Sequence, residues 1–331
     1  MPSEESSLNP MPANFLIYGS YGYTGDLIAR EAARQDMKPL LAGRNPDKLE
    51  AQARDLKLEK RAFSLDETAK LAAALNEVEV VLNCAGPFSR TADRIVARCL
   101  ETNTHYIDIT GEISVFESLA AKDPAAQQAG VMLLPGAGFD DVPSDCLAAH
   151  LKTRLPSANA LTLAFRAITR PSRGTIRSSV ENIPNGGRVR KAGKLIAVPA
   201  AWKRRAFDFG RGPVLATSIP WGDVSTAYFS TGIPNIIVYM AMPAGLHLLL
   251  VGSRYLGWIL RISPVQKLVK GLIGLLPAGP SQSLRLRGTS ILWAQVEDPA
   301  GERVQARLKT PESYALTAQT ALSAVRKVLA G

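Results

Sequence analysis

The sequence predicts an α/β protein in which an N-terminal, doubly wound parallel sheet is followed by a second, α+β domain. Over residues 13–150, short apolar strands alternate with helix-forming stretches, as in a parallel sheet with crossover helices. In 160–167 apolar and polar residues alternate one by one, which is typical of an antiparallel sheet. A chain of 331 residues is long enough for both domains.

The first expected strand, 14–18, runs directly into a glycine-rich turn. The turn has the spacing G-x-x-G-x-x-G, a variant of the usual dinucleotide motif, and a helix-forming stretch follows from Asp26 to Arg34. Glycines let the backbone approach a pyrophosphate closely, and a helix N-terminus offers it free N–H groups. In a Rossmann-type domain we therefore expect a nicotinamide dinucleotide to be bound by Gly19, Ser20, Tyr21, Gly22, Tyr23, Thr24 and Gly25.

The second expected strand, 38–42, leads into Gly43 and Arg44. An NAD site usually has an acidic residue at this point, about 20 residues past the glycines, whereas an arginine accommodates the 2′-phosphate of NADP. Arg44 lies 19 residues after Gly25. The sequence therefore favours NADP (NADPH) as the cofactor; the alternative is that Arg44 is only a surface residue at a helix start.

The rest of this unit follows in order. Asn45 as N-cap and Pro46 predict a helix to about Leu56. Further strands are expected at 61–63, 78–82, 105–108 and 131–134, and further helices at 66–75, 91–101, a stretch ending near 128, and 143–155. Open sheets bind ligands at the carboxyl ends of their strands, so the loop after 78–82 should lie against the ribose or nicotinamide. Its expected cofactor contacts are Asn83, Ala85, Gly86, Pro87 and Phe88; a plain turn is the alternative.

A hydride-transfer enzyme also needs a group that gives or takes a proton. The candidates lie at the carboxyl ends of the later strands, and for each of them a structural role is the alternative. They are Tyr106, Asp140 and Asp141 in the first place, and also Asp108, Glu112 and Asp145. The sequence has no metal-ligand cluster and no Tyr-x-x-x-Lys pair, so no metal is expected and the proton donor is not fixed.

These motifs resemble those of the saccharopine dehydrogenase-like oxidoreductases, a family that includes proteins called trans-acting enoyl reductases. The resemblance covers 13–150 through G-S-Y-G-Y-T-G, A-G-R, N-C-A-G-P-F, H-Y-I-D-I-T-G-E and P-G-A-G-F-D-D-V-P-S-D. It implies an NADP-binding Rossmann domain at 13–150, a substrate or oligomerisation domain at 151–310, and a C-terminal helix, 311–330, that packs back on the first domain. The family motif S-G-G-T reads Ser172-Arg-Gly-Thr here, so no substrate is carried over.

In the second half, several short stretches have strand character. They are 160–167, 214–219, 225–229, 236–240, 283–287 and 291–297, the last forming a hairpin with 302–308 around the turn at 298–301. Helical spacing of apolar residues predicts a final helix over 312–329.

Residues 244–276 form a very apolar segment that His247, Arg254 and Pro264 interrupt. A spanning helix needs about 20 predominantly apolar residues, so a helical pair is favoured. It could be a core or homodimer interface, or lie on a membrane surface with the cations Arg254, Arg261, Lys267 and Lys270 at anionic headgroups. It could also line a tunnel for an acyl chain.

The net charge of +10 is concentrated in one segment. Twelve lysines and arginines lie between Arg166 and Arg211, against Glu181 and Asp208. This is typical of a solvated face, or of a surface for an anionic partner such as an acyl carrier, coenzyme A, acidic lipid or nucleic acid. Few aromatic residues interleave with the charges, so nucleic-acid binding is not expected.

The first twelve residues are expected to be a disordered tail without a secretory signal, and the three cysteines form no CxxC pair. From these two observations we expect a cytoplasmic protein, with membrane association as the alternative. We expect an NADP-dependent oxidoreductase that acts by hydride transfer on a hydrophobic or acyl-linked substrate. The alternative is an NADPH-binding regulatory or membrane-associated protein without turnover.

Overall fold

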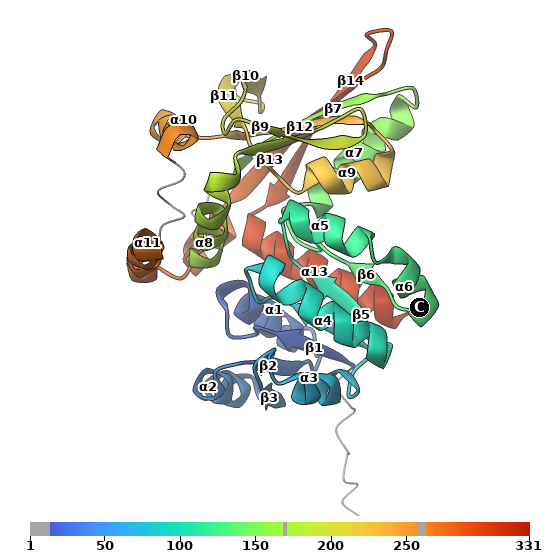
Figure 1. Ribbon diagram of the computed structural model, residues 1–331, viewed down its shortest axis with the longest axis vertical. Helices are drawn as coiled ribbons and strands as arrows, with labels where there is room; N and C mark the ends of the chain where they lie inside the picture. The colour runs from blue at the N-terminus through green and yellow to red at the C-terminus, as the bar shows by residue number, and fades with distance from the viewer. Residues whose placement is uncertain (1–13, 168–170, 257–262) are drawn as a thin grey trace, which may run out of the picture.

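The fold consists of two sheets stacked along the long axis of the molecule, with helices around each (Figure 1). It is described by a computed structural model for residues 14–167, 171–256 and 263–331. The first sheet has six parallel strands in the order β3-β2-β1-β4-β5-β6. They are β1 (Phe15–Tyr18), β2 (Leu40–Gly43), β3 (Lys60–Ala62), β4 (Val80–Asn83), β5 (His105–Asp108) and β6 (Leu133–Leu134). This confirms the doubly wound sheet, whose strand order reverses between β1 and β4.

The central strands of this sheet are buried on both faces, which explains why β1, β2 and β4 read as short continuous apolar runs. The crossover helices are α1 (Tyr23–Arg34), α2 (Pro46–Leu56), α3 (Thr68–Leu75), α4 (Phe88–Thr102), α5 (Ile113–Ala120) and α6 (Asp123–Ala129). The C-terminal helix α13 (Ser313–Leu329) contacts α1 and packs Ala318, Leu322 and Val325 into the same core as β1. The last helix of the chain therefore completes the first domain.

The second sheet has eight strands and is mixed. Its main path is β10-β11-β12-β7-β13-β14, with β8 paired to β12 and to β9. The strands are β7 (Ala160–Ala167), β8 (Gly187–Lys191), β9 (Lys194–Val198), β10 (Arg204–Asp208), β11 (Pro213–Ser218), β12 (Asn235–Ala241), β13 (Thr289–Glu297) and β14 (Arg303–Pro311). Helices α7 (Val142–Arg154) and α9 (Asp223–Thr231) cover one face. The α+β class expected for this region is confirmed.

Two expected strands are wrong. The stretch 225–229 lies in α9, because Gly232 ends the helix in a left-handed conformation and Val224 and Ala227 pack into the core. The stretch 283–287 lies in α12 (Gln282–Arg287), where the Ser281 side chain accepts a hydrogen bond from Leu284 N. In these two stretches, residues that favour strands or a one-by-one alternation of apolar and polar residues predicted a strand. Capping at a helix end favours the helix in each case.

The basic segment holds elements that the sequence did not reveal, namely α8 (Arg173–Asn182), the short 3₁₀ helix η1 (Ile183–Asn185), β8, β9 and β10. Its charges do not form one face. Arg190 is buried, and its guanidinium donates to Val224 O and to Glu117 Oε1 of α5, at 2.6 Å each. Lys191, Lys194 and Lys203 are exposed. Arg170 lies outside the described residues.

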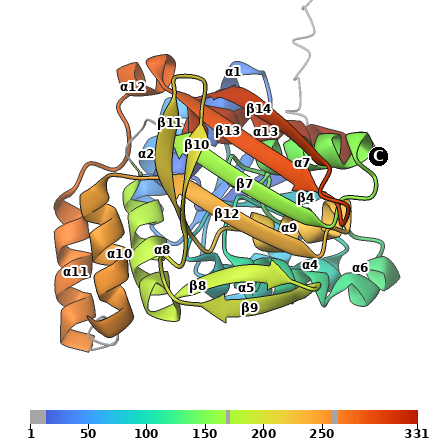
Figure 2. The same cartoon turned by 90° about the horizontal axis from the view of Figure 1, so that it is seen from above.

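The apolar segment forms two helices, α10 (Ala244–Leu256) and α11 (Ser263–Leu275), which stand beside α8 at one side of the molecule (Figure 2). Arg261 and the side chains of Lys267 and Lys270 lie outside the described residues. Within the described chain, no helix is both long and apolar enough to cross a membrane.

Candidate functional site

The glycine-rich loop wraps closely around the start of α1. Gly19 has a φ of +81°, and a Cβ there would lie 2.9 Å from the Cβ of Ala85. A Cβ on Gly25 would lie 2.4 Å from Gly19 O. Within the described part of the chain, no hydrogen bond uses the first-turn N–H groups of Tyr23 or Thr24. The loop therefore leaves donors and the positive end of a helix dipole free for an anion.

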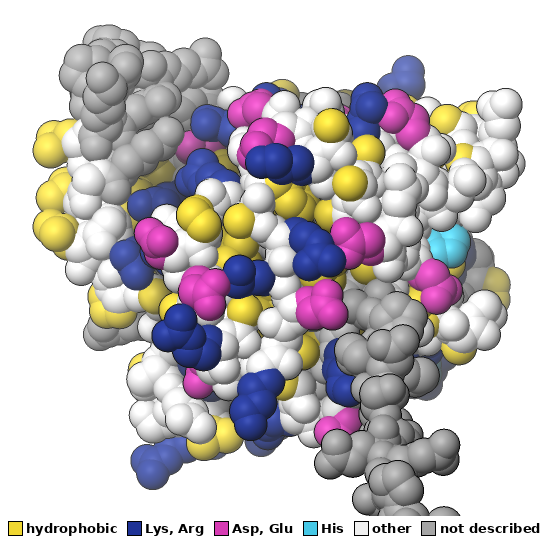
Figure 3. Space-filling model, turned by 90° about the horizontal axis from the view of Figure 1, so that it is seen from below, with side chains coloured by type: hydrophobic (Ala, Val, Ile, Leu, Met, Phe, Trp, Pro, Cys, Tyr) yellow, Lys and Arg dark blue, Asp and Glu magenta, His cyan; other side chains and the backbone are white. Residues whose placement is uncertain are grey.

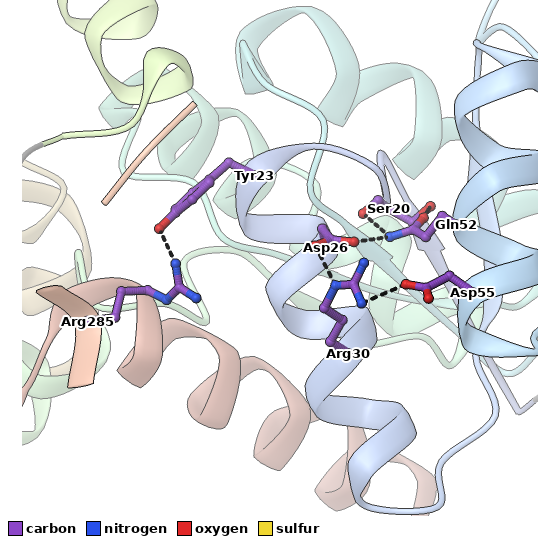
Figure 4. Close-up of polar contacts among 7 residues, drawn as sticks. All are labelled: Ser20, Tyr23, Asp26, Arg30, Gln52, Asp55 and Arg285. Atoms are coloured by element: carbon purple, nitrogen blue, oxygen red, sulfur yellow. Dashed lines mark hydrogen bonds and ion pairs between the residues drawn. The ribbon is translucent and has the colours of Figure 1, made fainter. Parts of the chain in front are cut away.

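A polar network connects this loop and α1 to α2 (Figure 4). Ser20 Oγ donates to Gln52 Oε1 at 2.8 Å, and Gln52 Nε2 donates to Ser20 O and to Asp26 Oδ1, both at 2.9 Å. Asp26 also binds Arg30, which reaches Asp55 of α2. Ser20 is fully buried, so its side chain shapes the loop. Gln52 sits in mid-helix, where nothing in the sequence marks it as a site residue.

Tyr23 connects the loop to the second half of the chain. Its hydroxyl donates to Pro280 O at 2.6 Å and accepts from Arg285 Nη1 at 2.9 Å (Figure 4). Its ring packs edge-on against Tyr314 of α13, with centroids 5.1 Å apart. Burial is the main cause of a raised pKa for the Tyr23 hydroxyl. The side chain of Tyr23 is thus committed to the domain interface, while its N–H remains available at the helix start.

The end of β2 carries cations without acidic partners. Arg44 is exposed, and no ion pair or hydrogen bond among the described residues engages its guanidinium. Tyr21 lies over Gly43, where a Cβ would come within 2.6 Å of Tyr21 Cε1, and its hydroxyl accepts from Asn45 N at 3.1 Å. Lys48 Nζ lies 5.9 Å from the Tyr21 ring centroid. Arg44, Lys48 and the N-terminus of α2 together suit a phosphate monoester.

Asn83 shapes the loop after β4 from inside. It is fully buried; its amide nitrogen donates to Thr91 Oγ1 and Tyr106 Oη, both at 3.1 Å. Its Oδ1 accepts from Ala85 N at 3.0 Å, and Thr91 Oγ1 donates to Ala85 O at 2.7 Å. Asn83 therefore sets the path of Ala85 and Gly86 beside Gly19, so these loop residues face the glycine loop.

The other end of this loop is fixed by Glu112. Its carboxylate oxygens accept from Phe88 N at 2.8 Å and from Ser89 N at 3.1 Å, at the first turn of α4. A carboxylate in this position caps the helix and complements its dipole. Glu112 is thereby used to hold Pro87 and Phe88 at the site.

Tyr106 is held inside the first sheet. It is fully buried, and its hydroxyl donates to Asp108 Oδ2 at 2.7 Å. Asp108 also accepts from Thr110 N and Gly136 N, and burial raises its pKa to about 6 against these hydrogen bonds. The Tyr106 hydroxyl also accepts a hydrogen bond from the Asn83 amide, so Tyr106 positions Asn83.

Asp140 and Asp141 are adjacent in sequence but differ in surroundings. Asp140 is half-buried, its side chain lies beside Gly111, and burial raises its pKa to about 6. Within the described residues, no hydrogen bond engages its carboxylate, although its backbone oxygen accepts from Trp221 Nε1 at 2.8 Å. Asp141 is buried at the start of α7, where Oδ2 has no partner. Burial and Asp223 raise the pKa of Asp141 well above its ordinary value. Of the two residues, Asp140 is partly exposed and Asp141 is buried.

A polar cavity of about 260 Å³ opens between the loop after β4 and α8. Arg90 of α4 and Glu181 of α8 face each other across it, at 3.4 Å. Because α8 was not expected from the sequence, half of this lining was not foreseen. The lining residues are Pro87, Ser89, Arg90, Glu112, Ser178, Glu181, Asn182 and Asn185. No group of three or more potential metal ligands occurs among the residues that the structure describes.

Comparison with known proteins identifies the first domain. Residues 15–134 match the family model of the saccharopine dehydrogenase NADP binding domain. The saccharopine dehydrogenase-like oxidoreductase of Mus musculus is 26% identical over 206 residues, which cover 54% of this chain and 48% of that protein. The trans-acting enoyl reductase of Mycobacterium ulcerans (strain Agy99) is 32% identical over 149 residues, 42% of this chain and 35% of that protein. The chain thus spans about half the length, or less, of these curated relatives.

A comparison with solved structures shows that the fold of both domains resembles that of a known protein. Apo saccharopine dehydrogenase (L-Glu forming) from Saccharomyces cerevisiae superposes with a TM-score of 0.65 at 12% identity, covering 96% of this chain and 92% of that one. At this identity the match shows the fold alone. The resemblance inferred from the glycine loop, Arg44 and the loop after β4 is confirmed by the family model.

Proposed function

We propose that this chain, whose residues 15–134 form a saccharopine dehydrogenase-type NADP-binding domain, is an NADP-dependent oxidoreductase. It transfers hydride between the nicotinamide and a hydrophobic or acyl-linked substrate. The observation that carries the cofactor preference is the exposed Arg44 after β2, which has no ion pair or hydrogen bond with its guanidinium among the described residues; it follows a loop whose first helical N–H groups are likewise unused there. The family match supports a nicotinamide cofactor, and Arg44 with Lys48 supports its 2′-phosphate.

The bound cofactor would supply the hydride, and residues of this chain would hold it in place. The N–H groups of Tyr23 and Thr24 bind the pyrophosphate, and Arg44 binds the 2′-phosphate. The loop at Ala85 and Gly86, set by Asn83, borders the ribose and nicotinamide. The glycines fit this role because a Cβ at Gly19 or Gly25 would collide with backbone or with Ala85.

Asp140 is the residue that we assign to proton transfer. A general acid or base works best when its pKa lies near the working pH, and burial raises the pKa of Asp140 to about 6. The residue as a whole is partly exposed, and none of the hydrogen bonds of the described residues engages its carboxylate. Tyr106 and Asp141, the other two candidates, are both buried, and the Tyr106 hydroxyl proton is committed to Asp108.

The acyl-linked substrate is supported by the position of α8. One side of α8 lines the polar cavity through Ser178 and Asn182. At its start, Arg173 donates to Gly274 O of α11 at 3.1 Å. A substrate with a polar portion and an apolar tail would place the polar portion in the cavity and the tail along α11.

The preference for NADP is tested by titrating the protein with NADPH and with NADH while following its fluorescence. We expect NADPH to bind at least about tenfold more tightly than NADH, because only NADPH can form a charge-assisted interaction between its 2′-phosphate and Arg44. Equal affinity for the two, or no binding of either, would contradict the proposal.

A second function is an NADPH-binding protein without turnover. It is favoured by the burial of Tyr106 and Asp141, which leaves Asp140 as the single accessible candidate of the three. Substrate-dependent oxidation of NADPH by the purified protein would exclude it.

A further inference from the structure

Exposed apolar side chains gather on one part of this molecule. Fifteen large hydrophobic side chains are exposed among the described residues, and ten of them lie between Leu246 and Leu286. Figure 3 shows hydrophobic side chains along the left edge beside the grey atoms, whereas acidic and basic side chains mix over the middle of the same view. A monomeric protein surface seldom carries such a concentration without a partner for it.

The two helices α10 and α11 present these side chains on regular faces. On α11, Leu268, Leu272 and Leu275 follow helical spacing and are 65%, 56% and 84% exposed. On α10, Leu248, Leu249 and Tyr255 are exposed to a similar degree. These six side chains are called the apolar face below.

The helices that carry the apolar face are attached to the rest of the fold by their other sides. His247 of α10 shares a hydrogen bond of 3.1 Å with Thr217 of β11, and Ile273 of α11 is buried. Arg254, near the end of α10, donates to the carbonyl oxygens of Ala200 and Ala201 at 2.7 and 2.8 Å. The apolar face is therefore a built feature of the folded protein.

The surroundings of the apolar face are cationic. From Val224 to Val296 the sequence contains no Asp or Glu. Beside α10, burial and the charges of Arg204 and Arg254 lower the pKa of His247, so both arginines lie close to this helix. Trp202 is 40% exposed, with Lys203 Nζ 4.4 Å from its ring centroid. This combination of leucines, an exposed tryptophan and cations complements an anionic phospholipid surface.

We propose that the apolar face docks on the surface of an anionic phospholipid bilayer. The leucines of α10 and α11 enter the boundary between headgroups and acyl chains, and Lys203 and Arg204 lie at the lipid phosphates. A second copy of the chain fits less well. In a two-fold contact the same cations would face one another, with no carboxylate from 224–296 between them.

Sedimentation with vesicles tests this proposal on the full chain. The vesicles are made of phosphatidylcholine alone, or of phosphatidylcholine mixed with phosphatidylglycerol. We expect binding to the anionic vesicles, weakened by salt, and little binding to the neutral ones. The variant Leu272→Glu/Leu275→Glu should lower the partition coefficient at least about tenfold. The matched control is Met132→Glu, an exposed apolar residue next to β6, which should bind vesicles as the unaltered protein does.

NADPH affinity, measured on each variant, reports whether the fold is intact, since none of the cofactor contacts proposed above belongs to α11. Absence of binding to anionic vesicles, or equal binding by the double glutamate variant, would overturn the proposal. Equal binding to both vesicle types would contradict the proposed contact of Lys203 and Arg204 with lipid phosphates, and with it the requirement for an anionic surface. If light scattering shows a dimer that the double variant dissociates, the apolar face is an interface between copies.

Discussion

At the scale of single residues, Asp140 is a partly exposed residue whose carboxyl group has a pKa raised by burial to about 6, and no hydrogen bond of the described residues engages its carboxylate oxygens. Neighbouring carboxyl groups lack one of these properties. Asp108 accepts three hydrogen bonds, and Asp141 is buried. Residue type alone does not tell which of these aspartates transfers a proton, because the exposure and hydrogen bonding of each depend on residues distant in sequence.

We expect Asp140→Asn to lower kcat on the order of 100-fold, the usual contribution of a general acid or base, while NADPH affinity stays unchanged. If Asp140 acts as acid, the rate falls as the pH rises through about 6; if it acts as base, the rate falls as the pH drops through about 6. The control is the exposed Asp36→Asn. An unchanged kcat in the Asp140 variant would remove this residue from the mechanism.

At the scale of elements, Gln52 connects α2 to α1 and the glycine loop. Its side chain forms hydrogen bonds with Ser20 of the loop and Asp26 of α1. Replacing Gln52 with leucine keeps the volume but leaves buried polar groups of Ser20 without partners. We expect the free energy of unfolding to fall by about 1–3 kcal/mol and NADPH to bind more weakly. Thermal unfolding and NADPH titration measure the two effects.

Gln127→Leu is the matched control for this element, since Gln127 lies exposed on α6 and its side chain, among the described residues, hydrogen-bonds to the exposed Asp123 alone. It should change neither quantity. If Gln52→Leu behaves like this control, the network beneath the loop does not support cofactor binding.

The elements also show which parts of the fold a sequence reveals. The strands β1, β2 and β4 are predictable because burial on both faces requires apolar runs, and Gly25 or Pro46 mark the adjoining helices. The helix α9 was taken for a strand, since Tyr228 and Phe229 favour strands and the end signal at Gly232 is local. The helix α8 was not found because it buries no residue fully, and so has no clear apolar period.

At the scale of the whole molecule, contacts between the domains depend on residues very distant in sequence. Arg190 of β8 binds Glu117 of α5, and Arg285 of α12 binds Tyr23 of the glycine loop. Neither pair has a local pattern, so a sequence alone does not predict them. The polar cavity likewise lies between parts distant in sequence, with Arg90 of α4 and Glu181 of α8 facing each other across it.

Buried carboxyl groups should give this protein an unusual dependence of stability on pH. Burial raises the pKa of Asp108, Asp140 and Asp145 to about 6, and it raises the pKa of Asp223 well above its ordinary value. The folded chain therefore keeps protons that the unfolded chain releases above about pH 4, so stability falls as the pH rises through this window. We expect the free energy of unfolding to be at least about 1 kcal/mol higher at pH 5 than at pH 7.5.

The variant Asp223→Asn removes one of these buried acids and should raise stability at pH 7.5 while flattening the pH dependence. Chemical denaturation at both pH values measures this. Carboxylates with lowered pKa, such as Asp93 beside Lys122, act in the opposite direction only at lower pH. A profile that rises steadily from pH 5 to 7.5 would contradict the assignment of buried, protonated carboxyl groups.

The most direct test of the central claim compares Arg44→Ala with Arg54→Ala in titrations with NADPH and NADH. Both arginines are exposed; Arg54 lies along α2, away from the end of β2. We expect Arg44→Ala to weaken NADPH binding by about 10- to 100-fold and to leave NADH binding nearly unchanged, since only NADPH carries the 2′-phosphate. Arg54→Ala should change neither affinity. If Arg44→Ala binds NADPH as tightly as the unaltered protein, or loses NADH and NADPH equally, Arg44 does not select the cofactor.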